Sequence, residues 1–102
     1  MEAGDKKEAI RQLLVFIDLM LSDSMNDFED SDPATGVVYS REWVAARNFM
    51  RCATMSGEIG DAEAMAGFTA KAKPLYKIAL EKAKTDDVSL KEIKKEMTSY
   101  GL

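Results

Sequence analysis

The chain has 102 residues, of which 46% are apolar and 31% are charged, and this composition is typical of a folded globular protein rather than a disordered one. A chain of this length supports one hydrophobic core, so we expect a single domain over residues 1–102. The net charge of −4 and the scattered lysines argue against nucleic acid as a partner.

Membrane insertion and secretion are not expected from the sequence. The longest apolar run, Leu13 to Ile17, ends at Asp18 and is much shorter than the ~18 residues that span a bilayer. The N-terminus lacks the basic and apolar regions of a secretory signal. Cys52 is the only cysteine, so it has no disulfide partner in the chain and fits a reducing compartment. We therefore expect a cytoplasmic protein.

A first helix is predicted over about residues 6–21. Asp5 and Glu8 have the spacing of a capping box at its start. Its wide apolar face contains Ile10, Leu13, Leu14, Ile17, Met20 and Leu21, with Phe16 at the edge. Val15 and Leu19 lie four residues apart on the other side, where a surface helix is usually polar. Either neighbouring helices of the chain cover this pair, or it contacts a partner protein or a second copy.

Residues 22–39 are predicted to form a long acidic loop. Pro33 and Gly36 break any helical period, and this segment contains five acidic residues and no basic one. A loop of this length is usually functional or mobile, and a short extended piece is expected only at residues 37–39. The acids do not occupy EF-hand positions, because Ala34 and Arg41 stand where ligands are required, so no metal site is predicted.

Two more helices are predicted over about residues 41–56 and 62–84. Ser40 and Asp61 are suitable N-caps, and Gly57 is suited to end the earlier helix. The earlier helix carries an apolar stripe of Trp43, Ala46, Phe49, Met50 and Ala53. The later helix contains Pro74, which predicts a kink; two helices meeting at Pro74 are the alternative, although Lys73 is a poor N-cap.

A fourth, short helix is predicted over about residues 90–99. Ser89 and Glu92 have capping-box spacing, and Gly101 lies just past the expected end. Leu90, Ile93 and Met97 are expected to face inward. Together these elements predict an all-α fold, a small bundle of about four helices. Its distinctive features are the long acidic loop after the first helix and the kinked third helix.

The chain lacks the side chains that most catalytic and metal sites use. It has no histidine, which removes the commonest general base and the commonest neutral metal ligand. One cysteine and no histidine also exclude a structural zinc site. We therefore expect no catalytic residue, no metal and no cofactor, and we do not expect an enzyme.

A group of arginines suggests an anion site. Arg47 and Arg51 lie four apart on one helix face, a spacing that lets two guanidinium groups hold one carboxylate or phosphate. Trp43 or Tyr39 offers a ring for stacking, and Arg41 is expected to join by way of the chain bend. The simpler interpretation, which we favour, is that these arginines pair with the acidic loop that precedes them.

These patterns favour a non-catalytic binding or regulatory protein. We expect a small inhibitor or adaptor that acts on a protein partner of unknown identity and forms a homodimer or larger assembly through Val15 and Leu19. Seven methionines suit adaptable contacts of this kind. The alternative function is sequestration of an anionic small ligand or nucleotide by Arg47 and Arg51.

Overall fold

The computed structural model describes residues 3–102. Over these residues the protein is mostly helical, with four α-helices and one small antiparallel sheet. In chain order the elements are α1 (Ala3–Met20), the short 3-10 helix η1 (Asp23–Met25), β1 (Glu29–Ser31), β2 (Val38–Ser40), α2 (Arg41–Glu58), α3 (Ala62–Lys82) and α4 (Asp87–Ser99). Four helices were predicted, whereas strand pairing was not.

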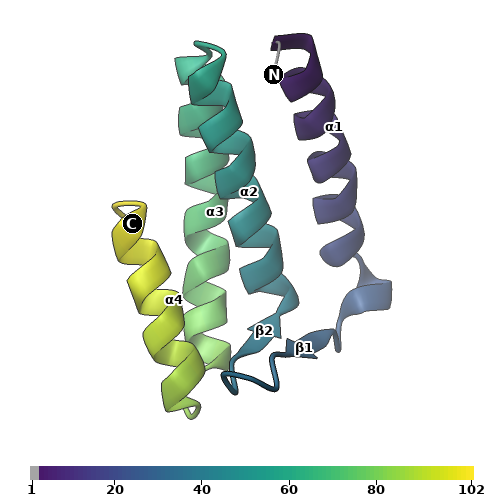
Figure 1. The fold of residues 1–102 in the computed structure, drawn as a ribbon. Coiled ribbons are helices and arrows are strands. Elements are labelled where there is room, and N and C mark those ends of the chain that lie inside the picture. Colours follow the sequence, from purple (N-terminus) through teal and green to yellow (C-terminus); the bar gives the residue numbers. More distant parts are fainter. Residues whose placement is uncertain (1–2) are drawn as a thin grey trace.

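Helix α2 lies in the middle of the molecule, between α1 and α3 (Figure 1). The shorter α4 lies beside the C-terminal half of α3, and the hairpin lies at the same end of the molecule (Figure 1). The buried core includes Ile17 of α1, Ile93 of α4, Trp43, Phe49 and Met50 of α2, and Ala72, Tyr76 and Ala79 of α3. Within residues 3–102, no helix combines the length and hydrophobicity needed to cross a bilayer.

The start of α1 differs from the prediction. The helix already includes Ala3, so Asp5 lies inside its first turn and does not precede it as an N-cap. An acid in this turn is still favourable, because the N-terminal end of a helix carries partial positive charge. Glu8 forms no capping box and instead accepts hydrogen bonds from the side chains of Arg11 and Gln12.

The prediction of a loop over residues 22–39 is only partly right. The extended piece expected at residues 37–39 largely corresponds to β2, but the segment also contains η1 and β1, and the two strands form a β-hairpin. Strands β1 and β2 pair in antiparallel register, with Ser31 opposite Val38. In the turn, the Asp32 carboxylate accepts a hydrogen bond from the Ala34 amide at 2.9 Å, and Gly36 adopts a φ of +78° that favours glycine. Val37 is buried in the core and anchors the hairpin.

The α2–α3 turn depends on two glycines with different roles. Ser40 caps α2 as predicted, by accepting a hydrogen bond from the Trp43 amide, but the helix runs on to Glu58. Gly57 therefore lies inside α2, where a Cβ atom would come within 2.9 Å of the Met65 sulfur. Gly60, with a φ of +80°, makes the turn. The predicted N-cap Asp61 accepts a hydrogen bond from the Ala64 amide at 3.0 Å.

Helix α3 is one continuous element with Pro74 in its interior. Two helices meeting at Pro74 are therefore excluded, and the kink at Pro74 remains a prediction. The inner face of α3 presents Ala72, Tyr76 and Ala79, and the small alanines allow α2 to pack closely. Met65, near the start of α3, is 40% exposed.

Helix α4 begins three residues earlier than predicted, because Asp86 rather than Ser89 is its N-cap. The Asp86 carboxylate accepts hydrogen bonds from both the amide and the hydroxyl of Ser89. The buried Ser89 hydroxyl oxygen in turn accepts the Val38 amide proton at 2.9 Å. Ser89 thus ties β2 to α4 over a long stretch of sequence.

Candidate functional site

Three apolar side chains on α1, here called the α1 strip, are exposed to solvent: Val15, Phe16 and Leu19. Val15 is 63% exposed and Leu19 is 54% exposed, whereas Ile17 on the same helix is 1% exposed. Helix α1 buries the side that faces α2 and leaves its outer side uncovered. Neighbouring helices of the chain therefore do not cover the predicted pair Val15 and Leu19.

The α1 strip is continuous along the helix. Val15 and Leu19 are four residues apart, and Phe16 and Leu19 are three apart, so all three side chains are neighbours on one surface. Phe16 was expected at the edge of the buried face, but it is 40% exposed and belongs to this surface. Its position beside that edge was the only sequence signal for this role.

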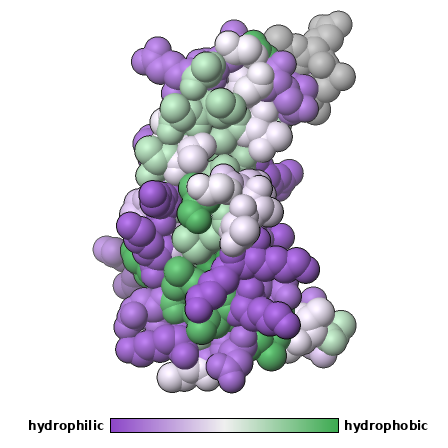
Figure 2. Space-filling model, turned by 90° about the vertical axis from the view of Figure 1, so that its left-hand side faces the viewer, coloured by the Kyte–Doolittle hydropathy of each residue, from purple (hydrophilic) through white to green (hydrophobic). Residues whose placement is uncertain are grey.

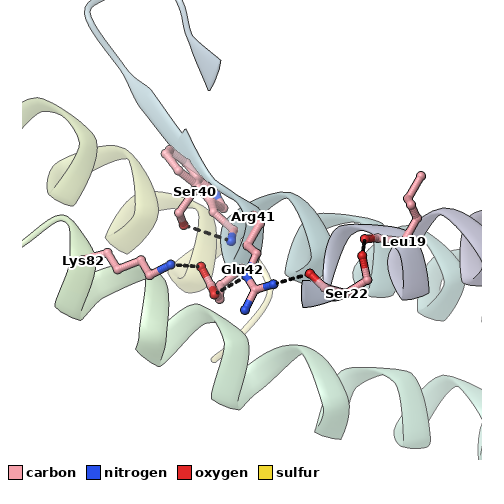
Figure 3. A network of polar contacts seen from close by, with 7 residues as sticks. Leu19, Ser22, Ser40, Arg41, Glu42 and Lys82 are labelled. Atoms are coloured by element: carbon pink, nitrogen blue, oxygen red, sulfur yellow. Dashed lines mark hydrogen bonds and ion pairs between the residues drawn. The ribbon is translucent and has the colours of Figure 1, made fainter. Parts of the chain in front are cut away.

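A polar network fixes the end of α1 that carries Leu19. The Arg41 guanidinium donates a hydrogen bond of 2.8 Å to the Ser22 carbonyl, and the Ser22 hydroxyl donates one of 2.6 Å to the Leu19 carbonyl. Figure 3 shows that the Leu19 side chain points away from this network. Arg41 therefore connects α2 to the end of α1 and is not part of an anion site with Arg47, which corrects the prediction.

Glu42 holds two cations within the same network. Lys82 of α3 donates to one carboxylate oxygen at 2.6 Å, and Arg41 donates to the other at 3.0 Å (Figure 3). Burial by itself raises the pKa of Glu42, but hydrogen bonds from Lys82, the Glu42 backbone amide and Arg41 outweigh it, so the pKa lies below its ordinary value. The charged carboxylate links α2 to α3.

The predicted anion-site residues are only partly brought together. Tyr39, Arg47 and Arg51 line one open cavity of about 430 Å³, together with Asp30, Val44, Asn48 and Tyr100. The guanidinium carbon of Arg47 lies 5.2 Å from the centre of the Tyr39 ring, a cation–π geometry. Arg51 donates to the Asn48 side chain at 3.3 Å. Asp30 places an acid in the same cavity.

Trp43 does not offer a stacking surface in this cavity, which corrects the prediction. Its side chain is 2% exposed, and its indole N–H donates a hydrogen bond of 2.8 Å to the Glu96 carboxylate on α4. The ring lies against Tyr39, with ring centres 4.4 Å apart. Trp43 therefore joins α2 to α4 and has a structural role.

Glu96 is the central acceptor between three helices, and no sequence pattern identified it. Besides Trp43, the Tyr76 hydroxyl of α3 donates to it at 2.7 Å, and Arg47 pairs with it at 3.1 Å. Burial, followed by the hydrogen bond and negative charge of Glu96, strongly raises the pKa of Tyr76. The arginine that was expected to pair with the acidic segment thus pairs with α4.

The side of the molecule formed by α3 and α4 has a different character. Figure 2 shows hydrophilic side chains around strongly apolar ones over its lower half, where α4 lies, and pale, weakly apolar ones above, where α3 extends beyond α4. The exposed residues of the upper part of α3 include Ala62, Ala66 and Ala70, whose side chains are small. Large apolar side chains are exposed on α3 and α4 as well: Met65, Ile78 and Val88.

A second cavity, of about 540 Å³, lies between the hairpin, the end of α3 and the start of α4. Its lining mixes acids such as Asp27 and Glu29 with Lys82 and the apolar Phe28. Lys82 is already bound by Glu42, and the Ser89 hydroxyl, also in the lining, is satisfied by Val38 and Asp86. Lys82 and Ser89 therefore serve the fold.

Cysteine and carboxylate chemistry is limited in the part of the chain that the structure describes. Cys52 is fully buried, and burial raises the pKa of its thiol although Arg51 acts in the opposite direction. Within residues 3–102, no group of three or more histidine, cysteine or acidic side chains is placed to hold a metal ion.

Comparisons of the chain with protein-family models, with curated protein sequences and with solved structures gave no match. The α1 strip and the cavity lined by Tyr39, Arg47 and Arg51 are accordingly assessed from their geometry alone.

Proposed function

We propose that this protein is a non-catalytic binding or regulatory protein, an inhibitor or adaptor, that acts by contacting another protein chain through the α1 strip. The observation that carries this proposal is the exposure of Val15 and Leu19, 63% and 54%, on a helix whose other side contributes the buried Ile17 and Met20 to the core. We place it in the cytoplasm, where the unpaired Cys52 stays reduced.

Single exposed apolar side chains are common on protein surfaces, so only their grouping into one contiguous patch indicates a binding surface. Val15, Phe16 and Leu19 are large and contiguous, and full burial of such a side chain stabilises by about 1.5–3 kcal/mol relative to full exposure. Only part of that gain is made in the isolated chain. A protein surface that covers the α1 strip buries the rest of this apolar area and gains the remaining stabilisation. This favours association with another protein or with a second copy in a homodimer.

Photo-crosslinking tests this proposal directly. A benzophenone amino acid at Phe16, in protein produced in its own source, is expected to give a covalent adduct of discrete mass. The same probe at Lys91, an exposed position on α4, is the control. An adduct of twice the chain mass identifies a homodimer, and a different mass identifies another protein. Absence of an adduct at residue 16, or identical adducts from both positions, contradicts the proposal.

A matched pair of variants separates binding from folding. Val15→Ser with Leu19→Ser should remove the adduct and change the free energy of unfolding by less than about 0.5 kcal/mol per site, as is usual for surface positions. Ile17→Ala on the buried face should instead cost about 2–5 kcal/mol. A large loss of stability in the double serine variant would show that the α1 strip supports the fold.

An anionic small ligand is the second candidate function, and the shared cavity of Tyr39, Arg47 and Arg51 favours it. Arg51 is the better test residue, because Arg47 also pairs with Glu96. Titration with ATP, followed by Trp43 fluorescence, should show saturable binding that Arg51→Ala abolishes while the melting temperature stays close to that of the wild type. A titration unaffected by Arg51→Ala contradicts this candidate.

A further inference from the structure

We propose that the partner of the α1 strip is a positively charged amphipathic helix of another protein. This inference rests on the proposed function, because it names the occupant of the same surface. Val15, Phe16 and Leu19 follow the axis of one helix over consecutive turns. A helix laid along this line brings apolar side chains of the same spacing against all three, as in the recognition of amphipathic helices by apolar surfaces.

The end of α1 beside the α1 strip is negatively charged. Between Gln12 and Ser40 the sequence contains six acidic residues and no lysine or arginine. The two nearest to the α1 strip, Asp18 and Asp23, are exposed and form no ion pair among the residues that the structure describes. Asp27 and Glu29 instead line the cavity that contains Lys82, and Asp30 lines the one that contains Arg47 and Arg51. A basic partner is therefore attracted and oriented by this region.

The nearest arginines do not neutralise this region. Arg11 lies one turn before Val15, but it pairs with Glu8 at 2.6 Å. Arg41 reaches the Ser22 carbonyl, but its charge is offset by Glu42 at 3.0 Å. The negative potential beside the α1 strip is consequently left for a partner to compensate.

The last turn of α1 also attracts a cation. The C-terminal end of a helix carries partial negative charge, which lysine or arginine in the last turn commonly offsets. Helix α1 has no basic residue in this turn and has Asp18 there instead. A lysine or arginine of the partner placed near Asp18 compensates both the carboxylate and the helix end.

The same charges disfavour a symmetric pairing of two α1 strips whose helices run parallel. In such a twofold dimer equivalent positions of the two helices face each other, so Asp18 and Asp23 of one copy lie near the same acids of the other. Like charges brought together across an interface are costly. A basic helix from a different protein avoids this repulsion.

The test is a selection from a phage-displayed library of amphipathic helical peptides. Each peptide carries fixed leucines on one face, and its polar positions vary among lysine, glutamate, glutamine and serine. The folded full-length chain is the target, and the Val15→Ser/Leu19→Ser variant is the matched control. We expect the selected peptides to be enriched in lysine and to lose binding to the control.

The outcomes separate this inference from the proposed function. Peptides that need Val15 and Leu19 but show no excess of lysine overturn the inference and leave the proposed function standing. Peptides that bind the control equally well, or no enrichment at all, contradict both. Dimerisation of the wild type in sedimentation experiments, abolished in the control, overturns the assignment to another protein and leaves a protein–protein function in place.

Charge variants test the electrostatic part with a selected lysine-rich peptide. Asp18→Asn with Asp23→Asn should weaken its Kd about twofold to thirtyfold, because exposed charge pairs contribute roughly 0.2–1 kcal/mol each. Glu63→Gln with Glu92→Gln makes the same change in net charge on α3 and α4 and should leave the Kd unchanged. Equal effects of the two pairs would show that only net charge matters and would overturn the inference.

Discussion

The hydroxyl of Tyr76 on α3 donates a hydrogen bond of 2.7 Å to the carboxylate of Glu96 on α4, and the Tyr76 side chain is fully buried. Because the Trp43 indole of α2 donates to the same oxygen, one carboxylate joins three helices. Tyr76→Phe removes one donor and keeps the ring. We expect a loss of about 1.5–3 kcal/mol in the free energy of unfolding, as is typical of a hydrogen bond to a charged group.

Urea unfolding followed by the fluorescence of Trp43, the only tryptophan, measures this loss. Tyr100→Phe is the matched control, because Tyr100 is 40% exposed. Equal stability changes in the two variants would show that the Tyr76–Glu96 bond contributes no more than a surface hydroxyl.

The charge of Glu42 makes part of the stability depend on pH. Its pKa in the folded chain lies below the ordinary value of 4.5, since Lys82 and Arg41 bind the carboxylate. The folded state therefore takes up this proton less readily than the unfolded state does. The resulting stabilisation is complete above pH 4.5 and is lost as the pH falls through the lower, folded-state pKa.

Glu42→Gln should accordingly lower the free energy of unfolding at neutral pH and lose this effect in acid. Urea titrations at a series of pH values measure the difference between wild type and variant, which we expect to shrink below pH 4.5. Glu63→Gln, at an exposed position, is the control. A difference that stays constant down to about pH 3 would argue against this role of Glu42.

The two glycines at the α2–α3 turn should respond oppositely to alanine. Gly60 has a φ of +80°, so Gly60→Ala forces a side chain into the left-handed region and should cost about 1–2 kcal/mol. Gly57 lies inside α2, where alanine gains up to about 1 kcal/mol of helix propensity. The approaching atom is the sulfur of Met65, a flexible, partly exposed side chain that can rotate away.

We therefore expect Gly57→Ala to leave the melting temperature unchanged or raise it, and Gly60→Ala to lower it. Thermal unfolding followed by circular dichroism measures both. A clear loss in Gly57→Ala would mean that Met65 is held in place and that close contact between α2 and α3 depends on this glycine.

Ser89 is expected to hold the hairpin against α4. Ser89→Ala leaves the Val38 amide without its 2.9 Å acceptor, and an unsatisfied buried group of this kind costs about 1–3 kcal/mol. Hydrogen exchange should show faster exchange of the Val38 amide in the variant. Ser99→Ala, which removes only a hydroxyl bonded to the Glu96 carbonyl within α4, is the control. Unchanged exchange at Val38 would contradict this role.

The sequence by itself determined much of the local structure. The apolar spacing located the four helices, and the N-caps Ser40 and Asp61 were identified because capping depends on a few adjacent residues. The same spacing separated Val15 and Leu19 from the buried face of α1, since helical period alone decides which side chains share a surface. These are short-range properties of the chain.

Only the tertiary structure decided which of the distant residues meet. Arg47 pairs with Glu96 on α4 rather than with the acidic segment that precedes it, because helix packing brings α4 beside α2. Residues 22–39 contain a hairpin because Val37 is buried in the core and Ser89 accepts the Val38 amide proton, contacts that no local pattern encodes. The exposure of Val15 and Leu19 was decided in the same way, since it depends on which helices the fold places around α1.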